Sequence, residues 1–79
     1  MKLELFLKET CPFCCKVMNE IYTSGRTDVE THDVDVNQED YNRLVREGGK
    51  YQVPCLFIDG KPMYESDDII AWLKQNPQR

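Results

Sequence analysis

The stretch that decides the fold is TCPFC, residues 10–14, which lies between an apolar strand and an amphipathic helix. Upstream of it, Leu3, Leu5 and Leu7 alternate with charged and aromatic residues, and this pattern predicts a strand with apolar groups on both faces, near a sheet centre. Downstream, apolar residues recur at helical spacing from Cys14, namely Val17, Met18, Ile21 and Tyr22. The helix is therefore expected to begin at the motif itself.

That position has chemical consequences for the two cysteines of the motif. Cys11 is expected near the N-cap and Pro12 at the first helical position, where a missing N–H group costs nothing. A sulfur at a helix N-terminus faces unpaired N–H donors and the positive end of the helix dipole, so its thiolate is stabilised and its pKa falls. The second sulfur, Cys14, follows one turn later on the same side, within reach of a disulfide. The pattern predicts a redox-active dithiol.

Two other uses of a C-x-x-C motif fit less well. A structural zinc site needs about four ligands, usually as two close pairs. The remaining candidates are Cys15, Cys55 and the lone His32, with no second C-x-x-C or H-x-x-H. A structural disulfide that closes a one-turn loop would restrain little of the unfolded chain. We therefore predict redox activity and no metal site.

Size and charge narrow the function classes. The 79 residues predict a single domain over positions 1–79, with one modest core. Ten basic against fourteen acidic residues give a net charge of −4, which argues against binding to a nucleic-acid backbone. No apolar run approaches membrane-spanning length, and Met1 is followed directly by a charged strand rather than a signal peptide. The expected location is cytoplasmic, where a C-x-x-C is more often catalytic than structural.

The rest of the chain predicts alternating strands and helices. In order after the first helix and its Gly25 cap, we expect an edge strand at Val29–Val36, a helix capped by Asn37 and ended by Gly48-Gly49, a strand at Val53–Ile58, a hairpin turn at Asp59-Gly60, and a helix from Ser66 to Asn76-Pro77. The order β-α-β-α-β-β-α, with a dithiol after the first strand, predicts an α/β protein of the thioredoxin fold. Its sheet would be four-stranded and mixed, flanked by three helices.

Three further residues invite a functional interpretation, and each has a simpler one. His32 lies in a polar strand with no recognisable catalytic motif around it, so an incidental strand histidine is the preferred interpretation. Cys15 falls about 100° round the helix from Cys14 and is expected to be exposed. Cys55 follows Pro54 in an apolar strand and is expected to be a buried small hydrophobe.

With these features together, the sequence resembles the glutaredoxin family. Its K-x-x-C-P-[YF]-C active site is matched from Lys8 to Cys14, and Val53-Pro54 stands where the family has T-V-P with a cis proline. The hairpin at 57–61 and the acidic helix start at 66–68 follow in the family's order. Two positions depart from it: Gln52 replaces the threonine, and Tyr64-Glu65 replaces a G-G pair. The segments around these departures are similar to the N-terminal domain of glutathione S-transferases.

The resemblance implies a glutathione-dependent thiol–disulfide oxidoreductase with Cys11 as nucleophile and Cys14 as resolving thiol. Glutathione would be a co-substrate rather than a tightly bound cofactor. The residues that the resemblance places around it are Lys8 for the glycine carboxylate, Phe13 as an aromatic wall, Val53 and Pro54 for the central cysteine, and Ser66 and Asp67 for the γ-glutamyl head. Its other partners would be disulfide-containing or glutathionylated proteins, and the chain is expected to be a monomer.

Two alternatives remain open from the sequence. One is a stand-alone glutathione-binding module, similar to a transferase N-terminal domain, whose cysteines do not turn over. The other is a thioredoxin-like reductase that is re-reduced by a flavin enzyme instead of glutathione, although its usual W-C-G-P-C is absent. An iron–sulfur cluster is disfavoured by Pro12, because relatives that hold a cluster usually replace this proline.

Overall fold

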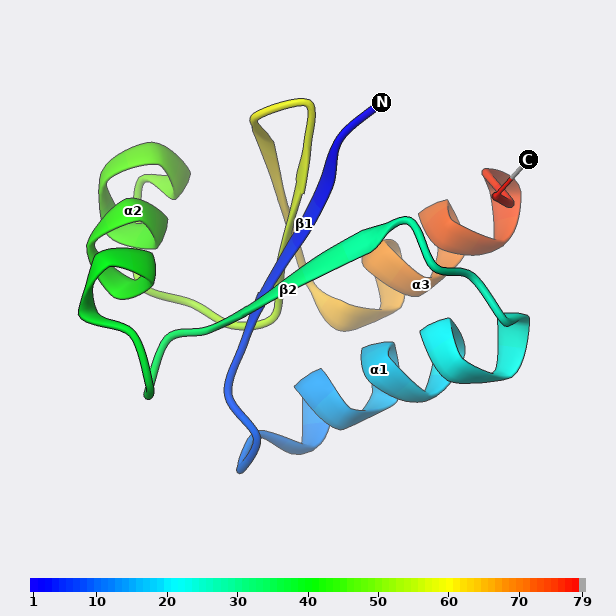
Figure 1. Ribbon diagram of the computed structural model, residues 1–79, viewed down its shortest axis with the longest axis horizontal. Coiled ribbons are helices and arrows are strands. Elements are labelled where there is room, and N and C mark those ends of the chain that lie inside the picture. Colours follow the sequence, from blue (N-terminus) through cyan, green and yellow to red (C-terminus); the bar gives the residue numbers. More distant parts are fainter. Residues whose placement is uncertain (79) are drawn as a thin grey trace.

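Four strands and three helices make up the part of the chain that the computed structural model describes, residues 1–78. In chain order they are β1 (Leu3–Leu7), α1 (Pro12–Ser24), β2 (Val29–Asp33), α2 (Gln38–Gly48), β3 (Cys55–Ile58), β4 (Lys61–Tyr64) and α3 (Ser66–Gln75). This is the predicted order of elements (Figure 1).

The strands form one mixed sheet in the order β2-β1-β3-β4. β1 pairs in parallel with β2 and antiparallel with β3, and β4 pairs antiparallel with β3. The predicted thioredoxin fold is confirmed, as is the expected edge position of β2. β1 therefore lies inside the sheet, and α1 leaves directly from its carboxyl end.

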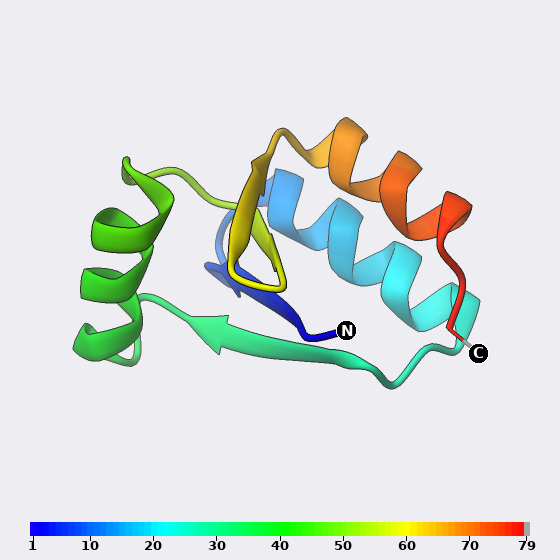
Figure 2. The ribbon, with the colours of Figure 1, turned by 90° about the horizontal axis from the view of Figure 1, so that it is seen from above.

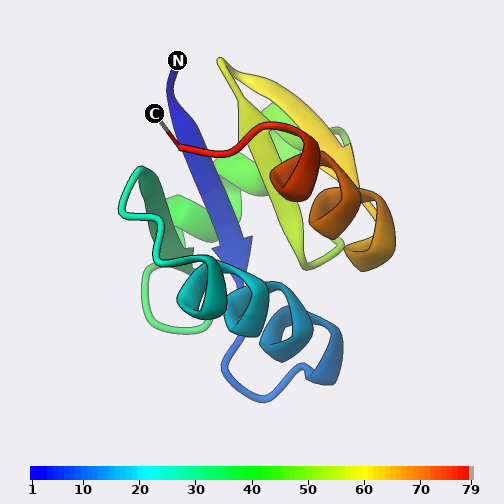
Figure 3. The same cartoon turned by 90° about the vertical axis from the view of Figure 1, so that its right-hand side faces the viewer.

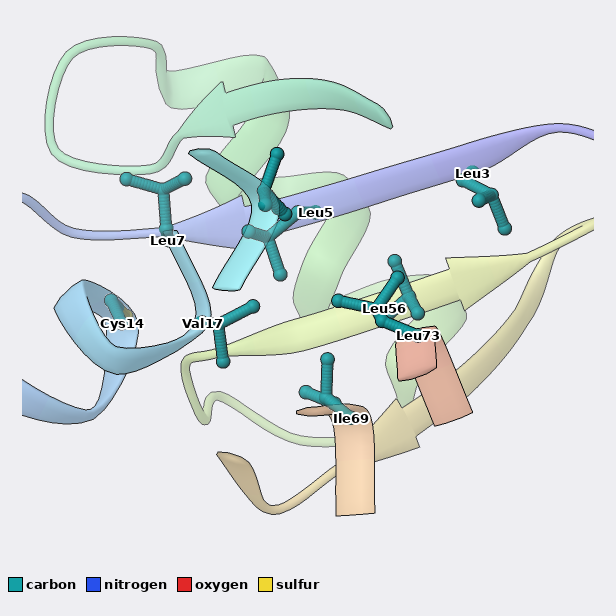
Figure 4. Close-up of a cluster of buried hydrophobic side chains, with 9 residues drawn as sticks. Leu3, Leu5, Leu7, Cys14, Val17, Leu56, Ile69 and Leu73 are labelled. Atoms are coloured by element: carbon teal, nitrogen blue, oxygen red, sulfur yellow. The ribbon is translucent and has the colours of Figure 1, made fainter. Parts of the chain in front are cut away.

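The helices cover the sheet unequally. α1 and α3 lie side by side on one face and α2 lies alone on the other (Figures 2 and 3). All five residues of β1 are buried, which agrees with the prediction of apolar groups on both faces of this strand. The α1/α3 face carries the larger core (Figure 4), formed by Leu3, Leu5, Leu7, Cys14, Val17, Ile21, Leu56, Ile69 and Leu73.

The α2 face has a smaller core in which Phe6 and Phe57 meet with ring centroids 4.8 Å apart. The side chain of Tyr64, which belongs to β4, links the end of α2 to this face of the sheet. Its hydroxyl lies 3.0 Å from the Gly48 carbonyl oxygen and 3.1 Å from that of Lys50. These two hydrogen bonds therefore fix the position of the first residues between α2 and β3.

One carboxylate is buried on the α2 face. Glu4 is 3 % exposed, and both of its oxygens accept hydrogen bonds from the guanidinium of Arg43, with 2.9 Å between Nη2 and Oε1. His32 Nε2 lies 3.1 Å from the same carboxylate, and His32 Nδ1 lies 3.3 Å from Asp40. The hydrogen bonds from Arg43 lower the pKa of Glu4 to about 2, although burial opposes the charged form. His32 thus belongs to a network of polar contacts that joins α2 to the sheet.

Both glycine caps and the asparagine cap lie where they were predicted. Gly25 follows α1 with φ 72°, and Gly49 follows α2 with φ 85°. The Asn37 side chain accepts hydrogen bonds from the backbone N–H groups of Glu39 and Asp40. These caps fix the points at which the chain returns to the sheet.

Three details of the predicted elements are wrong. β2 ends at Asp33 rather than Val36, because the carbonyl and carboxylate oxygens of Asp33 accept hydrogen bonds from the following backbone and close a turn. β3 begins at Cys55 rather than Val53, since Pro54 has no N–H group to donate to a neighbouring strand. Tyr22, which was counted in the apolar stripe of the first helix, is 76 % exposed.

Candidate active site

Cys11 occupies the N-cap of α1, as the sequence predicts. Its backbone is extended, with φ −89° and ψ 119°, and Pro12 takes the first helical position. The Cys11 N–H donates to the Lys8 carbonyl oxygen at 3.2 Å, which closes the turn between β1 and α1. The thiol is therefore held at the end of a central strand and at the start of a helix, half-buried.

The surroundings of the two motif thiols push their pKa values apart. Burial disfavours the Cys11 thiolate, but hydrogen bonds from the Cys14 N–H and thiol and from the Phe13 N–H, with the charge of Lys8, lower its pKa overall. Cys14 is 1 % exposed, and burial above all raises the pKa of this thiol to about 12. Cys11 is thus the more acidic of the two thiols.

A groove of about 330 Å³ lies beside Cys11. Its lining brings together residues from three separate parts of the chain: Phe13, Gln52, Val53, Pro54, Glu65, Ser66 and Asp67. Cys11 adjoins it, with its Sγ 4.0 Å from the Val53 carbonyl oxygen. The Val53–Pro54 peptide is cis, as the resemblance implied.

Lys8, in contrast, is not among the residues that line this groove. Its ammonium lies 3.6 Å from the Asp35 carboxylate and 5.0 Å from the centre of the Tyr51 ring. A hydrogen bond to Tyr51 and the charge of Asp35 raise the pKa of Lys8. Its charge still acts on the Cys11 thiolate.

Two residues of the groove were not singled out as site residues from the sequence. Gln52 Nε2 donates to Glu65 Oε1 at 3.1 Å, so these side chains meet across the groove. Both positions had been noted only as departures from the family pattern. Each departure stands directly before a predicted contact residue, Gln52 before Val53 and Glu65 before Ser66. That position was the signal that could have identified them.

α3 begins at Ser66, as the sequence predicts. Ser66 is buried, and the N-cap of the helix is Glu65. Glu65 has φ 72° and ψ 118°, because the chain turns directly from β4 into α3 at this residue.

The backbone of Glu65 yields a stability prediction. A non-glycine residue with this φ is strained, at a cost on the order of 1–3 kcal/mol. Glu65→Gly and Glu65→Ala both lose the contact with Gln52, but only glycine relieves the strain. We expect the free energy of unfolding, measured in urea, to be about 1 kcal/mol higher for the glycine variant than for the alanine variant. A glycine variant less stable than the alanine variant would contradict this account.

The remaining cysteines lie as predicted, and all four cysteines are unpaired thiols in the structure. Cys15 is exposed, with its Sγ 3.7 Å from the Glu9 carbonyl oxygen. Cys55 is fully buried, and burial raises the pKa of its thiol to about 11. Among residues 1–78, the one trio of potential metal ligands is Glu4, Glu30 and His32, which includes no cysteine.

Comparisons with known proteins agree on the relationship. A family model described as glutaredoxin matches residues 3–63. Glutaredoxin 3 of Escherichia coli K12 is 29 % identical over 69 residues, which cover 87 % of this chain and 82 % of that protein. The crystal structure of a wheat glutaredoxin has a TM-score of 0.71 at 29 % identity, covering 96 % of this chain and 73 % of the other. A glutathione transferase Omega 3C of Trametes versicolor shares the fold, with a TM-score of 0.79 at 21 % identity, and the match covers 95 % of this chain and 33 % of that one.

Proposed function

The chain belongs to the glutaredoxin family of thiol–disulfide oxidoreductases, and we propose that it uses glutathione to reduce protein disulfides and glutathione mixed disulfides. The observation that carries this proposal is the position of Cys11. A thiol of lowered pKa stands at a helix N-terminus and adjoins a groove that ends at the start of a second helix. A nucleophile and a place for a small charged thiol are thus next to each other.

Reduction of a mixed disulfide would need Cys11 alone. Its thiolate attacks the glutathione sulfur, the target protein leaves as a thiolate that takes up a proton, and Cys11 is left glutathionylated. A second glutathione thiolate then attacks the glutathione sulfur of this adduct. The products are glutathione disulfide and the free Cys11 thiolate. Each turnover thus consumes one glutathione from solution, and the other half of the glutathione disulfide comes from the mixed disulfide itself.

Reduction of a protein disulfide would also need Cys14. Cys11 attacks one sulfur of the target and forms a mixed disulfide, and the second target sulfur leaves as a thiolate. Cys14 then attacks the Cys11 sulfur, gives up its proton, and releases the target as a dithiol. With a pKa of about 12, Cys14 stays protonated until that step, so it does not compete with Cys11 as the first nucleophile. Two glutathione molecules restore the dithiol.

The groove supports a specific placement of glutathione. The free N–H groups at the start of α3, at Ser66 and Asp67, suit the γ-glutamyl carboxylate, and the Asp67 carboxylate suits the ammonium. The backbone of Val53 would pair with the central cysteine, and Phe13 would cover it. Lys8 would reach the glycine carboxylate only if it turned away from Asp35.

The test is an assay with two reducing systems. Purified protein is given a glutathionylated substrate with glutathione, glutathione reductase and NADPH, and separately a protein disulfide with a thioredoxin reductase and NADPH. We expect turnover in the first system. Turnover in the second alone would favour the thioredoxin-like alternative, and no rate above background in either would favour a binding module whose cysteines do not turn over.

A second prediction concerns the γ-glutamyl end of the groove. Asp67→Ala should raise the KM for glutathione about fivefold, because an exposed charge contact is worth about 1 kcal/mol. The pH dependence of Cys11 alkylation should not change, because the thiolate is stabilised at a different helix end. The control is Asp68→Ala, which removes the neighbouring acid of the same helix turn. An unchanged KM in a folded Asp67 variant would show that this carboxylate does not bind the ligand.

The proposal extends to the setting in which the protein works. We expect a monomeric single domain in a reducing, cytoplasmic compartment, with glutathione and disulfide-bearing proteins as partners and no nucleic acid. Among residues 1–78, no helix has the length and apolar character needed to cross a membrane.

A further inference from the structure

An ion pair stands at the end of the groove where the α3 helix begins. Lys16, one turn into α1 after the dithiol, donates from its Nζ to Asp67 Oδ1 at 2.9 Å. Asp67 lines the groove, whereas Lys16 does not. The pair therefore connects the helix that carries the nucleophile to the helix that forms the end of the groove.

We propose that Lys16 is a specificity-determining residue, an internal competitor that occupies Asp67 until the ammonium of a γ-glutamyl ligand displaces it. This inference rests on the proposed function, in which Asp67 accepts that ammonium. The side chain of Lys16 and the head of the ligand present the same group, a primary ammonium that donates to one carboxylate. Only one of them can hold Oδ1 in the same way at the same time.

The geometry makes the exchange easy. The side chains of Lys16 and Asp67 are 51 % and 85 % exposed, so water can replace either partner as the contact opens. Exposed ion pairs of this kind are weak, and breaking one changes an equilibrium about two- to fivefold. Lys16 would thus lower the affinity for glutathione by such a factor without blocking the groove.

The charge of Lys16 can be removed without disturbing the chemistry at Cys11. The charge of Lys8 lowers the pKa of Cys11, whereas the ammonium of Lys16 lies against Asp67 on another helix. Lys16 makes no side-chain hydrogen bond within residues 1–78 other than the one to Asp67. Lys16→Gln therefore frees Asp67 and leaves the nucleophile in place.

The experiment measures binding of two probes by calorimetry. S-methylglutathione keeps the ammonium, and N-acetyl-S-methylglutathione lacks it. We expect Lys16→Gln to lower the Kd of the first probe about two- to fivefold and to leave that of the second unchanged. The KM for glutathione in turnover should fall by the same factor, with kcat unchanged.

A matched control variant is Lys74→Gln. Lys74 forms a similar surface pair between α3 and α1, with its Nζ 3.7 Å from Glu20, but neither residue lines the groove. This variant should leave the Kd of both probes unchanged. A second control is Lys16→Gln in an Asp67→Asn background, where the lysine has no carboxylate to occupy and its removal should have no effect.

Each other outcome would contradict the role of Lys16 as a competitor for Asp67. An unchanged or raised Kd for S-methylglutathione in Lys16→Gln would overturn the competitor role, and a raised Kd would mean that the lysine itself contacts the ligand. An equal gain for both probes would also overturn it, because the ammonium would then be irrelevant. Wild-type protein without any glutathione turnover or binding would instead overturn the proposed function, and this inference with it.

Discussion

Replacing Cys11 with serine is expected to bring disulfide reduction down to the uncatalysed background on every substrate. A serine hydroxyl does not ionise near neutral pH and cannot form the sulfur–sulfur bond on which each step depends. Loss of a nucleophile of this kind typically lowers turnover by about 10⁴-fold or more. The measurement is the rate of NADPH oxidation with a glutathionylated peptide. The serine variant is tested at a protein concentration at which the rate given by the wild type no longer rises.

Cys14→Ser is the informative companion to that variant. It should keep most of the activity on glutathione mixed disulfides, for which Cys11 alone suffices, and lose reduction of protein disulfides, for which a resolving thiol is needed. Burial and a pKa of about 12 suit Cys14 to the second role and not to the first. Equal loss of activity on a glutathionylated peptide in both serine variants would contradict this division of roles.

The largest effect on stability is expected from Arg43→Ala. This change would leave the Glu4 carboxylate buried at the sheet centre without the guanidinium that binds both of its oxygens. Removal of one partner of a buried pair costs about 3–5 kcal/mol. Urea unfolding at pH 7 should show a loss of this size. Arg46→Ala, on the same helix but with a 66 % exposed side chain, should change stability by less than about 1 kcal/mol.

The same pair predicts a dependence on pH. The pKa of Glu4 is about 2 when folded and near the ordinary carboxyl value of 4.5 when unfolded. The stabilisation from its ionised form is therefore complete above about pH 4.5 and is lost as the pH falls towards 2. In Arg43→Ala the carboxyl can protonate at a higher pH, so the difference in stability between wild type and variant should shrink from pH 7 to pH 3. A difference that stays constant over this range would contradict the role given to the pair.

Local patterns were sufficient to predict most of the fold. The alternation in β1, the proline after Cys11 and the asparagine before α2 each act within a few residues, and each has the predicted result in the structure. The two strand-boundary errors have a local cause as well. A hydrophobic pattern does not reveal where hydrogen bonding to a neighbouring strand stops.

The charged contacts could not be predicted in the same way. Glu4 is a charged residue in a strand whose two faces are both buried, and its burial depends on Arg43, 39 residues later on another helix. The pairing of Lys16 with Asp67 spans 51 residues and depends on how two helices pack. The φ of Glu65 follows from the turn between β4 and α3 rather than from any preference of glutamate. These features arise from tertiary packing.

The pairing of β1 with β3 separates the molecule into two ends. Cys11 follows the carboxyl end of β1 and Val53 precedes β3, so both belong to one end of the strand pair. The N-terminus and the turn at Asp59 lie at the opposite end (Figure 1), where Lys2 and Asp59 hold each other through hydrogen bonds of 2.7 and 2.9 Å. A label, a tether or a fused partner attached at that end would leave the dithiol free to meet its substrates. The protein can be held by one end while it reacts at the other.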